Sequence, residues 1–202
     1  MELVFFLGMV GFISLSGVLM PGPVFAAAVV KGVEDRYAGA WIAMGHLLVE
    51  VPLIFAIGAG FHYIFTHPAV RIVVGLAGGA LLLYMGARMI AMRRDVRVVE
   101  RGFPGHPLVA GIATTLTNPY FFLWWATAGA WLIFLALGYG VTGLAAFIVV
   151  HESCDLAWNS TVSYTAHMSR RFWTPRVAWV FGACGALLLV LGAYFIVSVW
   201  FV

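Results

Sequence analysis

The sequence contains few charged residues. Asp, Glu, Lys and Arg make up only 9% of the 202 residues, whereas hydrophobic residues make up 63%. An ordinary soluble domain has about 25% charged and about 45–50% apolar residues. A chain with this composition cannot cover itself with polar surface in water. The composition therefore excludes a soluble globular enzyme, a disordered chain and a nucleic-acid-binding domain, although the net charge is +3.

Cysteine is scarce as well. Cys154 and Cys184 both lie in apolar stretches, so nothing indicates a disulfide framework. The alternating ten-residue pattern of a membrane β-barrel is also absent. Only helices and closed barrels satisfy the backbone hydrogen bonds in lipid. The sequence therefore predicts an all-α integral membrane protein.

Long apolar runs, separated by polar or glycine-containing breaks, define the predicted membrane helices. One transmembrane helix needs about 20 apolar residues, so a chain of this length holds about six of them with short loops and no separate soluble domain. The predicted ranges are 3–30, 38–63, 69–92, 107–136, 140–166 and 176–201.

Basic residues are distributed unevenly among the predicted loops. The loops after the first, third and fifth helices carry ten Lys and Arg residues, whereas the opposite side carries only Arg71. Loops rich in Lys and Arg remain in the cytoplasm. We therefore expect a multi-pass protein of the cytoplasmic membrane, with these three loops in the cytoplasm and both termini outside. The ten residues are Lys31, Arg36, Arg88, Arg93, Arg94, Arg97, Arg101, Arg170, Arg171 and Arg176.

The two halves of the sequence resemble each other at an offset of about 105 residues. Residues 79–87 match residues 185–193, and the His-x-x-x-Glu motif that begins at His46 corresponds to the His-x-x-x-Asp motif that begins at His151. A repeat of three spans places the second copy upside down in the membrane, as in many secondary transporters. The predicted organisation is one membrane domain with a first three-helix repeat (1–92), a cytoplasmic loop (93–106) and a second, inverted three-helix repeat (107–202).

Proline residues interrupt the first and fourth predicted helices, at Pro21-Gly22-Pro23 and at Asn118-Pro119. Proline inside a helix removes a hydrogen bond and clashes with the preceding turn. Lipid does not tolerate the freed carbonyl groups, so such a break is buried in protein or faces a water-filled cavity. Half-helix ends can hold a carboxylate or an ammonium group. We predict that these five residues bind substrate; the alternative is that each break is a packing kink.

Ionisable residues lie near the centres of the second and fifth predicted helices. A charged carboxylate at the bilayer centre costs about 2.5–3.5 kcal/mol, so these side chains must face the bundle interior, be neutralised, or both. His46 and Glu50 share one helix face, as do His151 and Asp155, and repeat symmetry brings the two faces together. We predict that Glu50 and Asp155 bind the substrate, and that both couple to an ion together with His46, His151 and Glu152. The alternative is that the histidines only hold the carboxylates in place.

The fifth helix also contains His151-Glu152-x-x-Asp155, one residue short of the zinc signature H-E-x-x-H. An intramembrane metal-dependent hydrolase is therefore an alternative. No third ligand at suitable spacing is evident, and His46-x-x-x-Glu50 is the better-matched counterpart. We therefore predict no enzyme, no catalytic residue, no metal site and no cofactor.

Several short motifs are distributed over nearly the whole chain: Met20-Pro21-Gly22-Pro23, Lys31-Gly32, Ala38-Gly39, Gly45-His46, residues 78–88, Thr117-Asn118-Pro119 and His151-x-x-x-Asp155-Leu156-x-Trp158. With these motifs the sequence resembles the LysE/RhtB family of amino-acid exporters, the LysE-type translocators. The resemblance implies a six-helix core of two repeats and the export of amino acids or related solutes, driven by a gradient of protons or sodium. The partners would be an amino acid as small-molecule substrate, a coupling ion and the lipid bilayer, and no nucleic acid.

Two departures from the family pattern concern the centre of the membrane. The family often has a basic residue after the Asn-Pro pair, whereas this chain has Tyr120, and Glu50 and Glu152 add acidic groups. A more negative centre favours a cationic substrate. The predicted function is therefore secondary active efflux of amino acids, basic or other cationic ones among them, by proton or cation antiport. Export of a divalent metal cation is the alternative. The substrate, the coupling ion and any homo-oligomer are left open.

Overall fold

The computed structural model describes residues 2–61, 68–93, 105–169, 176–198 and 200. Within these ranges the chain is helical and contains no β-strand. The prediction of an all-α protein is confirmed. The elements are α1 (Leu3–Val18), α2 (Pro23–Glu34), α3 (Ala38–Ala56), η1 (Ile57–Phe61), α5 (Pro68–Met92), α7 (Pro107–Leu116), α8 (Pro119–Trp124), η2 (Trp125–Gly129), α9 (Ala130–Leu137), α10 (Gly140–Met168) and α12 (Val177–Ser198).

Several of these helices are long and apolar enough to cross a membrane. Among the described residues, four segments meet this condition, and the bent pair formed by α1 and α2 makes a fifth. Leu76–Ala91 of α5 and Pro107–Leu116 are shorter apolar helices. The chain is thus a multi-pass membrane protein. The four long segments are Ala38–Gly60, Tyr120–Leu137, Gly140–Met168 and Ala178–Val197.

Both predicted helix breaks are present. The axes of α1 and α2 meet at 78°, and α2 begins at Pro23, a residue that needs no N–H partner at the first helical position. The second break lies between α7 and α8, where the Asn118 side chain accepts a hydrogen bond from the Tyr120 N–H at 3.2 Å. An N-cap asparagine followed by proline at the first helical position is a common way to restart a helix.

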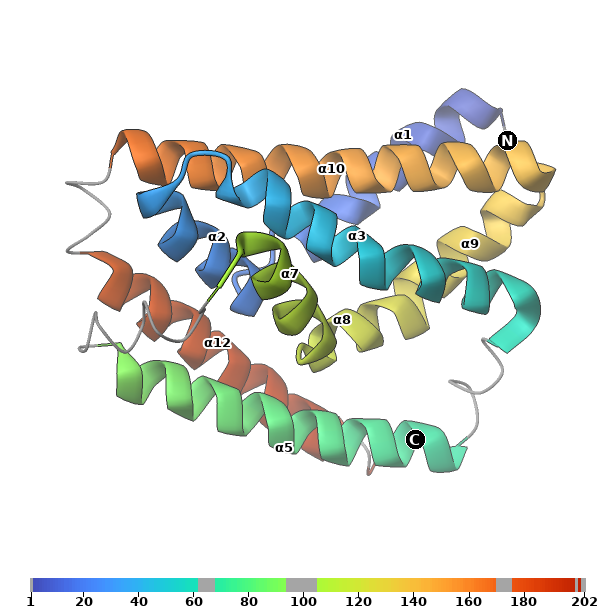
Figure 1. The fold of residues 1–202 in the computed structure, drawn as a ribbon. Helices are drawn as coiled ribbons and strands as arrows, with labels where there is room; N and C mark the ends of the chain where they lie inside the picture. Colours follow the sequence, from blue (N-terminus) through green and yellow to red (C-terminus); the bar gives the residue numbers. More distant parts are fainter. Residues whose placement is uncertain (1, 62–67, 94–104, 170–175, 199, 201–202) are drawn as a thin grey trace.

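The helices run back and forth between two ends of the bundle (Figure 1). The C-terminal ends of α2, α5 and α10 lie at one end, on the left in Figure 1, whereas the start of α1 and the C-terminal ends of α3, α9 and α12 lie at the other. This arrangement brings the helix ends that precede the first, third and fifth predicted loops to the same end. Of the ten basic residues expected there, Arg94, Arg97, Arg101, Arg170 and Arg171 lie outside the described residues.

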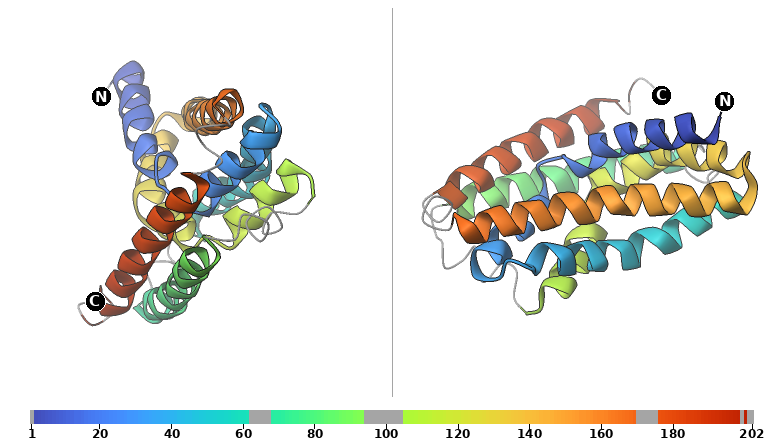
Figure 2. Two further views of the ribbon diagram at one scale, coloured as in Figure 1. Left: turned by 90° about the vertical axis from the view of Figure 1, so that its left-hand side faces the viewer. Right: turned by 90° about the horizontal axis from the view of Figure 1, so that it is seen from above.

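Helices α5 and α12 lie side by side along one edge of the bundle (Figure 2). A Cβ atom added to Gly79 would lie 2.8 Å from the Gly192 carbonyl oxygen, and one added to Gly192 would lie 2.7 Å from the Gly79 oxygen. Gly86 and Gly185 show the same reciprocal contact, at 2.6 and 2.7 Å. Small residues let membrane helices approach this closely, so the glycines hold α5 against α12.

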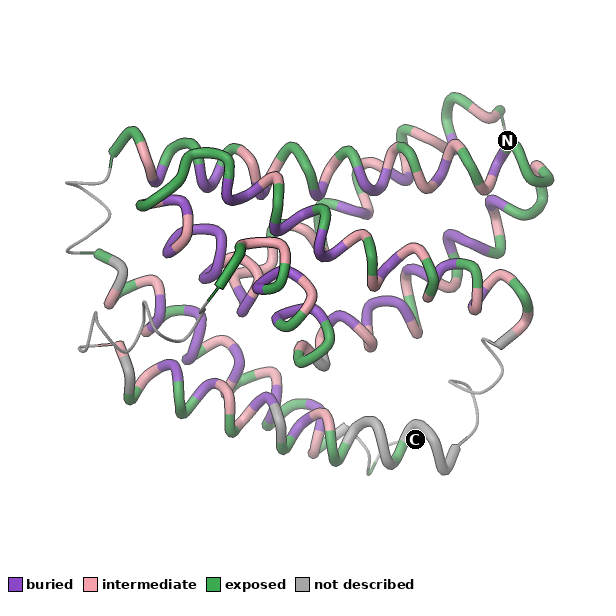
Figure 3. The backbone as a smooth tube through the Cα atoms, in the orientation of Figure 1, coloured by how far each residue is buried: buried purple, intermediate pink, exposed green. Residues whose placement is uncertain are grey.

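Buried residues lie along the inward faces of the helices, whereas the outward faces are exposed (Figure 3). Many exposed side chains are large and apolar, Phe12, Phe134 and Trp179 among them. Such a surface is unfavourable in water and suits the hydrocarbon of a bilayer. The interior holds two apolar clusters, one built around α2, α5 and α12 and the other around α1, η2, α9 and α10.

Candidate functional site

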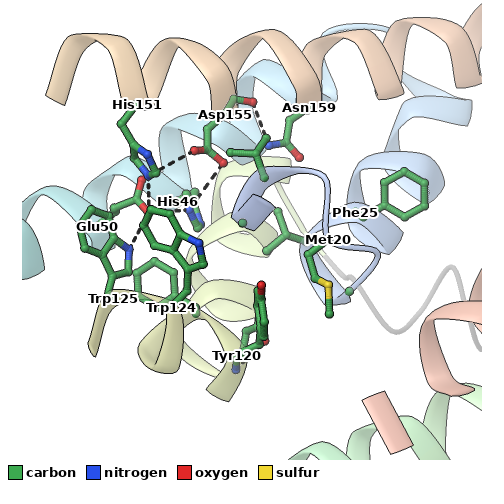
Figure 4. Close-up of a pocket in the computed structure, with 16 residues that line it drawn as sticks. Met20, Phe25, His46, Glu50, Tyr120, Trp124, Trp125, His151, Asp155 and Asn159 are labelled. Atoms are coloured by element: carbon green, nitrogen blue, oxygen red, sulfur yellow. Dashed lines mark hydrogen bonds and ion pairs between the residues drawn. The ribbon is translucent and has the colours of Figure 1, made fainter. Parts of the chain in front are cut away.

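Polar side chains in the interior come mainly from α1, α3, α7 and α10. The segment of α3 from His46 to Glu50 and the segment of α10 from His151 to Asp155 face each other across the bundle (Figure 4). The exposed fraction of the Glu50 residue is 2% and that of His151 is 2%. The buried polar residues are Ser14, His46, Glu50, Thr114, Thr115, His151, Glu152, Asp155, Asn159 and Ser163.

The two histidines and two carboxylates form a single group, here called the quartet (His46, Glu50, His151 and Asp155). Within α3, His46 Nε2 lies 3.1 Å from Glu50 Oε1, and within α10, His151 Nε2 lies 3.7 Å from Asp155 Oδ2. Across the two helices, His46 Nε2 lies 3.8 Å from Asp155 Oδ1, and His151 Nε2 lies 3.4 Å from Glu50 Oε1. Each histidine therefore contacts both acids. The structure brings the two predicted pairs together, as the repeat pattern led us to expect.

Hydroxyl groups on other helices fix both imidazole rings from behind. His46 Nδ1 lies 2.7 Å from Thr115 Oγ1 on α7, and His151 Nδ1 lies 2.7 Å from Ser14 Oγ on α1. Sequence reasoning did not select Ser14. Ser14 is a polar residue directly after the apolar residues 3–13, which could have marked it as a candidate. Nothing in the sequence indicates which helix it contacts. The two contacts turn the Nε2 atoms of both rings towards the carboxylates.

The hydroxyl of Thr115 determines which nitrogen of His46 carries a proton. Thr115 Oγ1 donates its single hydrogen to the Gly111 carbonyl oxygen at 2.8 Å, so it accepts a hydrogen bond from Nδ1–H of His46. In the neutral ring, Nε2 then carries a lone pair and faces the Glu50 carboxylate. Two acceptors at 3.1 Å repel each other. A proton or another cation must therefore lie between His46 and Glu50.

Glu50 is the more firmly held of the two acids. Besides the two histidines, the indole Nε1–H of Trp125 donates to Glu50 Oε1 at 2.9 Å. Asp155 has no comparable donor, and its Oδ2 atom, like Glu50 Oε2, has no hydrogen-bond partner in the described part of the chain. The side chain of Asn159 instead donates to the Asp155 backbone oxygen at 2.9 Å.

A cavity of about 60 Å³ opens onto the quartet. Both helix breaks contribute to its wall: Gly22 from the first break, and Asn118 from the second. Pro21 and Pro23 are not among the described lining residues, and the side chain of Pro119 lies outside the described ones. The other lining residues are Gly17, Val18, Met20, Val24, Phe25, Tyr120, Phe121, Trp124, Trp125 and Asn159.

Glu152, the remaining predicted residue, lies on α10 beside the quartet. It is buried, is within electrostatic reach of Glu50 and Asp155, and does not line the cavity. Its Oε1 atom has no hydrogen-bond partner among the described residues. Three carboxyl groups thus lie beside two imidazoles in the interior. No lysine or arginine of the described chain lines the cavity.

Comparison with known proteins identifies the family of this chain. The LysE type translocator family matches residues 15–199, a range that contains the quartet and both helix breaks. The chain belongs to this family. The resemblance seen in the sequence is therefore confirmed, and membership of a translocator family indicates a transport protein rather than an enzyme.

This LysE type translocator is similar to a protein of Bacillus subtilis over most of its length. YcgF of Bacillus subtilis (strain 168), whose name gives amino acid efflux as a provisional function, is 28% identical over 181 residues. The match covers 86% of this chain and 87% of YcgF. No solved structure matches the chain. Family membership and this relative together support an exporter.

Proposed function

We propose that this LysE type translocator is a secondary active exporter of amino acids that couples export to the inward movement of protons or of another cation such as sodium. The observation that carries the proposal is that both helix breaks and the buried quartet meet at one cavity. Broken helices beside ionisable groups near the bilayer midplane are typical of substrate and ion sites in secondary transporters.

The proposed architecture is a pair of inverted three-helix repeats, residues 1–92 and 107–202, joined by a cytoplasmic loop over 93–106. The glycine contacts between α5 and α12 support it. Under the repeat offset Gly79 corresponds to Gly185, and Gly86 corresponds to Gly192. Gly79 contacts Gly192 while Gly86 contacts Gly185. Such an exchange of partners is what a two-fold axis between the repeats produces.

The ring contacts of the histidines support the same axis. His46 is held by a hydroxyl from α7, the first half of the broken fourth helix, and its counterpart His151 is held by a hydroxyl from α1, the first half of the broken first helix. In the proposed mechanism the bundle rocks about this axis and exposes the cavity to one side of the membrane and then to the other.

The substrate would bind between the breaks and the quartet. The start of α2 and the amide of Asn118 present donors for the carboxylate of an amino acid. Asp155, which faces the cavity and lacks a firm partner, suits the substrate's ammonium group. The surplus of acids over described cations favours basic or other cationic amino acids. Pro21, Pro23 and Pro119 would act by breaking the helices.

Coupling would depend on the need for a cation between His46 and Glu50. When the substrate's ammonium group reaches Asp155, the quartet gains one positive charge, and a proton held between the imidazoles and acids becomes unfavourable. Its release towards the cytoplasm would complete the exchange, with Glu152 as a neighbouring carboxyl group. We place the protein in the cytoplasmic membrane, with both termini outside and the basic helix ends in the cytoplasm.

The proposal is tested by transport in proteoliposomes. Purified protein is reconstituted with internal radiolabelled amino acids, basic and neutral, and efflux is measured with an inward proton gradient, an inward sodium gradient or neither. We expect efflux of at least one amino acid that is accelerated by one gradient and absent from liposomes without protein. Efflux that responds to neither gradient, or no efflux of any amino acid tested, would contradict the proposed function.

A further inference from the structure

Nitrogen and oxygen atoms of the quartet are spaced much like neighbouring ligands of one metal ion. Zinc binds imidazole nitrogen and carboxylate oxygen at about 2.0–2.2 Å, which gives tetrahedral edges of about 3.3–3.6 Å. Both imidazole Nε2 atoms lie 3.1 and 3.4 Å from Glu50 Oε1, and they lie 3.8 and 3.7 Å from Oδ1 and Oδ2 of Asp155, respectively. One donor atom each from His46, Glu50 and Asp155 lie within 4.8 Å of one another. His151 is not in that group of three, so its ring and the Asp155 carboxylate would have to move for all four groups to close around one ion.

The outer contacts of the quartet are those that a metal site requires. A histidine that binds metal through one nitrogen usually donates the other ring N–H to a fixed acceptor. His46 does so to Thr115, which leaves the Nε2 lone pair directed at the centre. His151 has the hydroxyl of Ser14 in the equivalent place, and the Trp125 indole orients the Glu50 carboxylate.

Charge leads to the same conclusion. With both imidazoles neutral and both acids ionised, Glu50 and Asp155 give the quartet two negative charges. No lysine or arginine among the described residues lines the cavity. One divalent cation balances the two carboxylates, whereas a monovalent ion leaves one charge without compensation inside the membrane.

We propose that His46, Glu50, His151 and Asp155 bind one divalent transition-metal ion through two imidazole nitrogens and two carboxylate groups. Mixed nitrogen and oxygen ligands in a four-coordinate site favour zinc or cobalt over magnesium and calcium, which require more ligands and only oxygen. This inference goes beyond amino-acid export and rests on the geometry, the outer contacts and the charge of the quartet. Because the metal occupies the place of the coupling cation, it competes with that cation.

The test is a titration of the purified protein in detergent with Co²⁺, after removal of any affinity tag. Four-coordinate Co²⁺ has an intense visible absorption band, so we expect a band that saturates at one equivalent and disappears when Zn²⁺ is added. Mg²⁺ and Ca²⁺ in large excess should not remove it. No band, or a band lost to Mg²⁺, would overturn the proposal.

Variants locate the site. His46→Gln, His151→Gln and Asp155→Asn should each weaken Co²⁺ binding by about 100-fold or more. The matched control is the double variant Cys154→Ser, Cys184→Ser, which removes both thiols and should leave the band and its affinity unchanged. Binding that survives the quartet variants, or that is lost with the cysteines, would contradict the assignment.

A measurement on the unaltered protein guards against variants that fail to fold. X-ray absorption of the zinc-loaded chain should report two imidazole nitrogens and light oxygen ligands at about 2.0–2.2 Å with no sulfur. A shell without imidazole would overturn the proposal. A protein that exports amino acids but binds no cobalt would refute this inference and leave the proposed function intact. A protein that binds cobalt but moves no amino acid would refute the proposed function and leave this inference intact.

Discussion

The two histidine–acid pairs have the same spacing on their helices but different surroundings. On α3, Glu50 Oε1 has three nitrogen atoms within 3.4 Å, those of His46, His151 and Trp125. On α10, Asp155 has the same two histidines at 3.7 and 3.8 Å and no indole. Glu50 is therefore held in one position, whereas Asp155 retains freedom to bind a ligand. One proposed repeat thus supplies the fixed acid and the other the mobile acid.

The first halves of the two broken helices, α7 and α1, also differ, in how closely each packs on its neighbouring helix. A Cβ atom on Gly45 of α3 would clash with the Leu108 carbonyl of α7, and one on Gly111 of α7 would clash with the Ile42 carbonyl of α3. Between α1 and α10, a Cβ atom on Gly11 would meet only a methyl group of Val150 at 3.8 Å. An open groove lies along that side. Helix α3 therefore packs closely on α7, whereas α10 packs less closely on α1.

The largest effect expected from this comparison is on transport. Asp155→Asn should lower the rate of amino-acid efflux by about 100-fold or more, because it removes one of the two quartet carboxylates that line the cavity. Its thermal stability in detergent should change by less than about 1 kcal/mol, since the side chain has no firm partner in the described chain. Efflux assays and thermal unfolding of the same preparation check both statements.

Glu50→Gln is the matched variant in the other pair. It should also abolish efflux while the protein still inserts into the membrane, but it should in addition cost about 1–3 kcal/mol of stability, because charged hydrogen bonds are lost. If Asp155→Asn proves the more destabilising of the two, the distinction between a fixed and a mobile acid is wrong. Full activity in either variant would show that these carboxylates are not essential.

Much of this site could be predicted from the sequence, because its main features are local. Prolines mark the breaks, and the i,i+4 spacing places a histidine and an acid on one face of a helix. The length of the apolar runs predicts the helices themselves. The angle of 78° between α1 and α2 is larger than the prolines alone indicate.

Contacts between distant segments could not be predicted. The hydrogen bonds between Ser14 and His151 and between Thr115 and His46 join residues 137 and 69 positions apart. These contacts depend on the position of one helix relative to another along their axes. Close packing at glycines determines that position, and the composition of the sequence does not reveal it. For the same reason the sequence did not show that only Gly22 of the Pro21-Gly22-Pro23 break lines the cavity.

Alanine substitutions of glycine test the difference between the two helix contacts. Gly45→Ala should destabilise the protein by about 1–3 kcal/mol, since the added methyl group overlaps the Leu108 carbonyl. Gly11→Ala should change stability by less than about 1 kcal/mol, because space is available and alanine favours the helix. Thermal unfolding in detergent measures both. Equal losses would mean that α1 packs on α10 as closely as α3 packs on α7.

The indole of Trp125 provides a smaller and more specific test. Trp125→Phe keeps an aromatic ring and removes the donor to Glu50, which should cost about 1–3 kcal/mol. Trp124→Phe is the control, because its indole donates to the part-buried Ser16 hydroxyl at 3.2 Å and its loss should cost about 0.5–1.5 kcal/mol. If the two variants are equally stable, the indole does not hold Glu50 in place.

Small losses of stability are also expected at the two hydroxyl groups behind the histidines. Thr115→Val and Ser14→Ala each remove one partner of a ring Nδ1 atom, and each should cost about 0.5–1.5 kcal/mol. Their effects on Co²⁺ affinity should be larger, about 10-fold to 100-fold, because a ligand ring without its outer contact loses its orientation. Titration of both variants compares the two proposed repeats directly. If only Thr115→Val loses Co²⁺ affinity, then only His46 depends on its hydroxyl contact. The two rings would then be related by position and not by function.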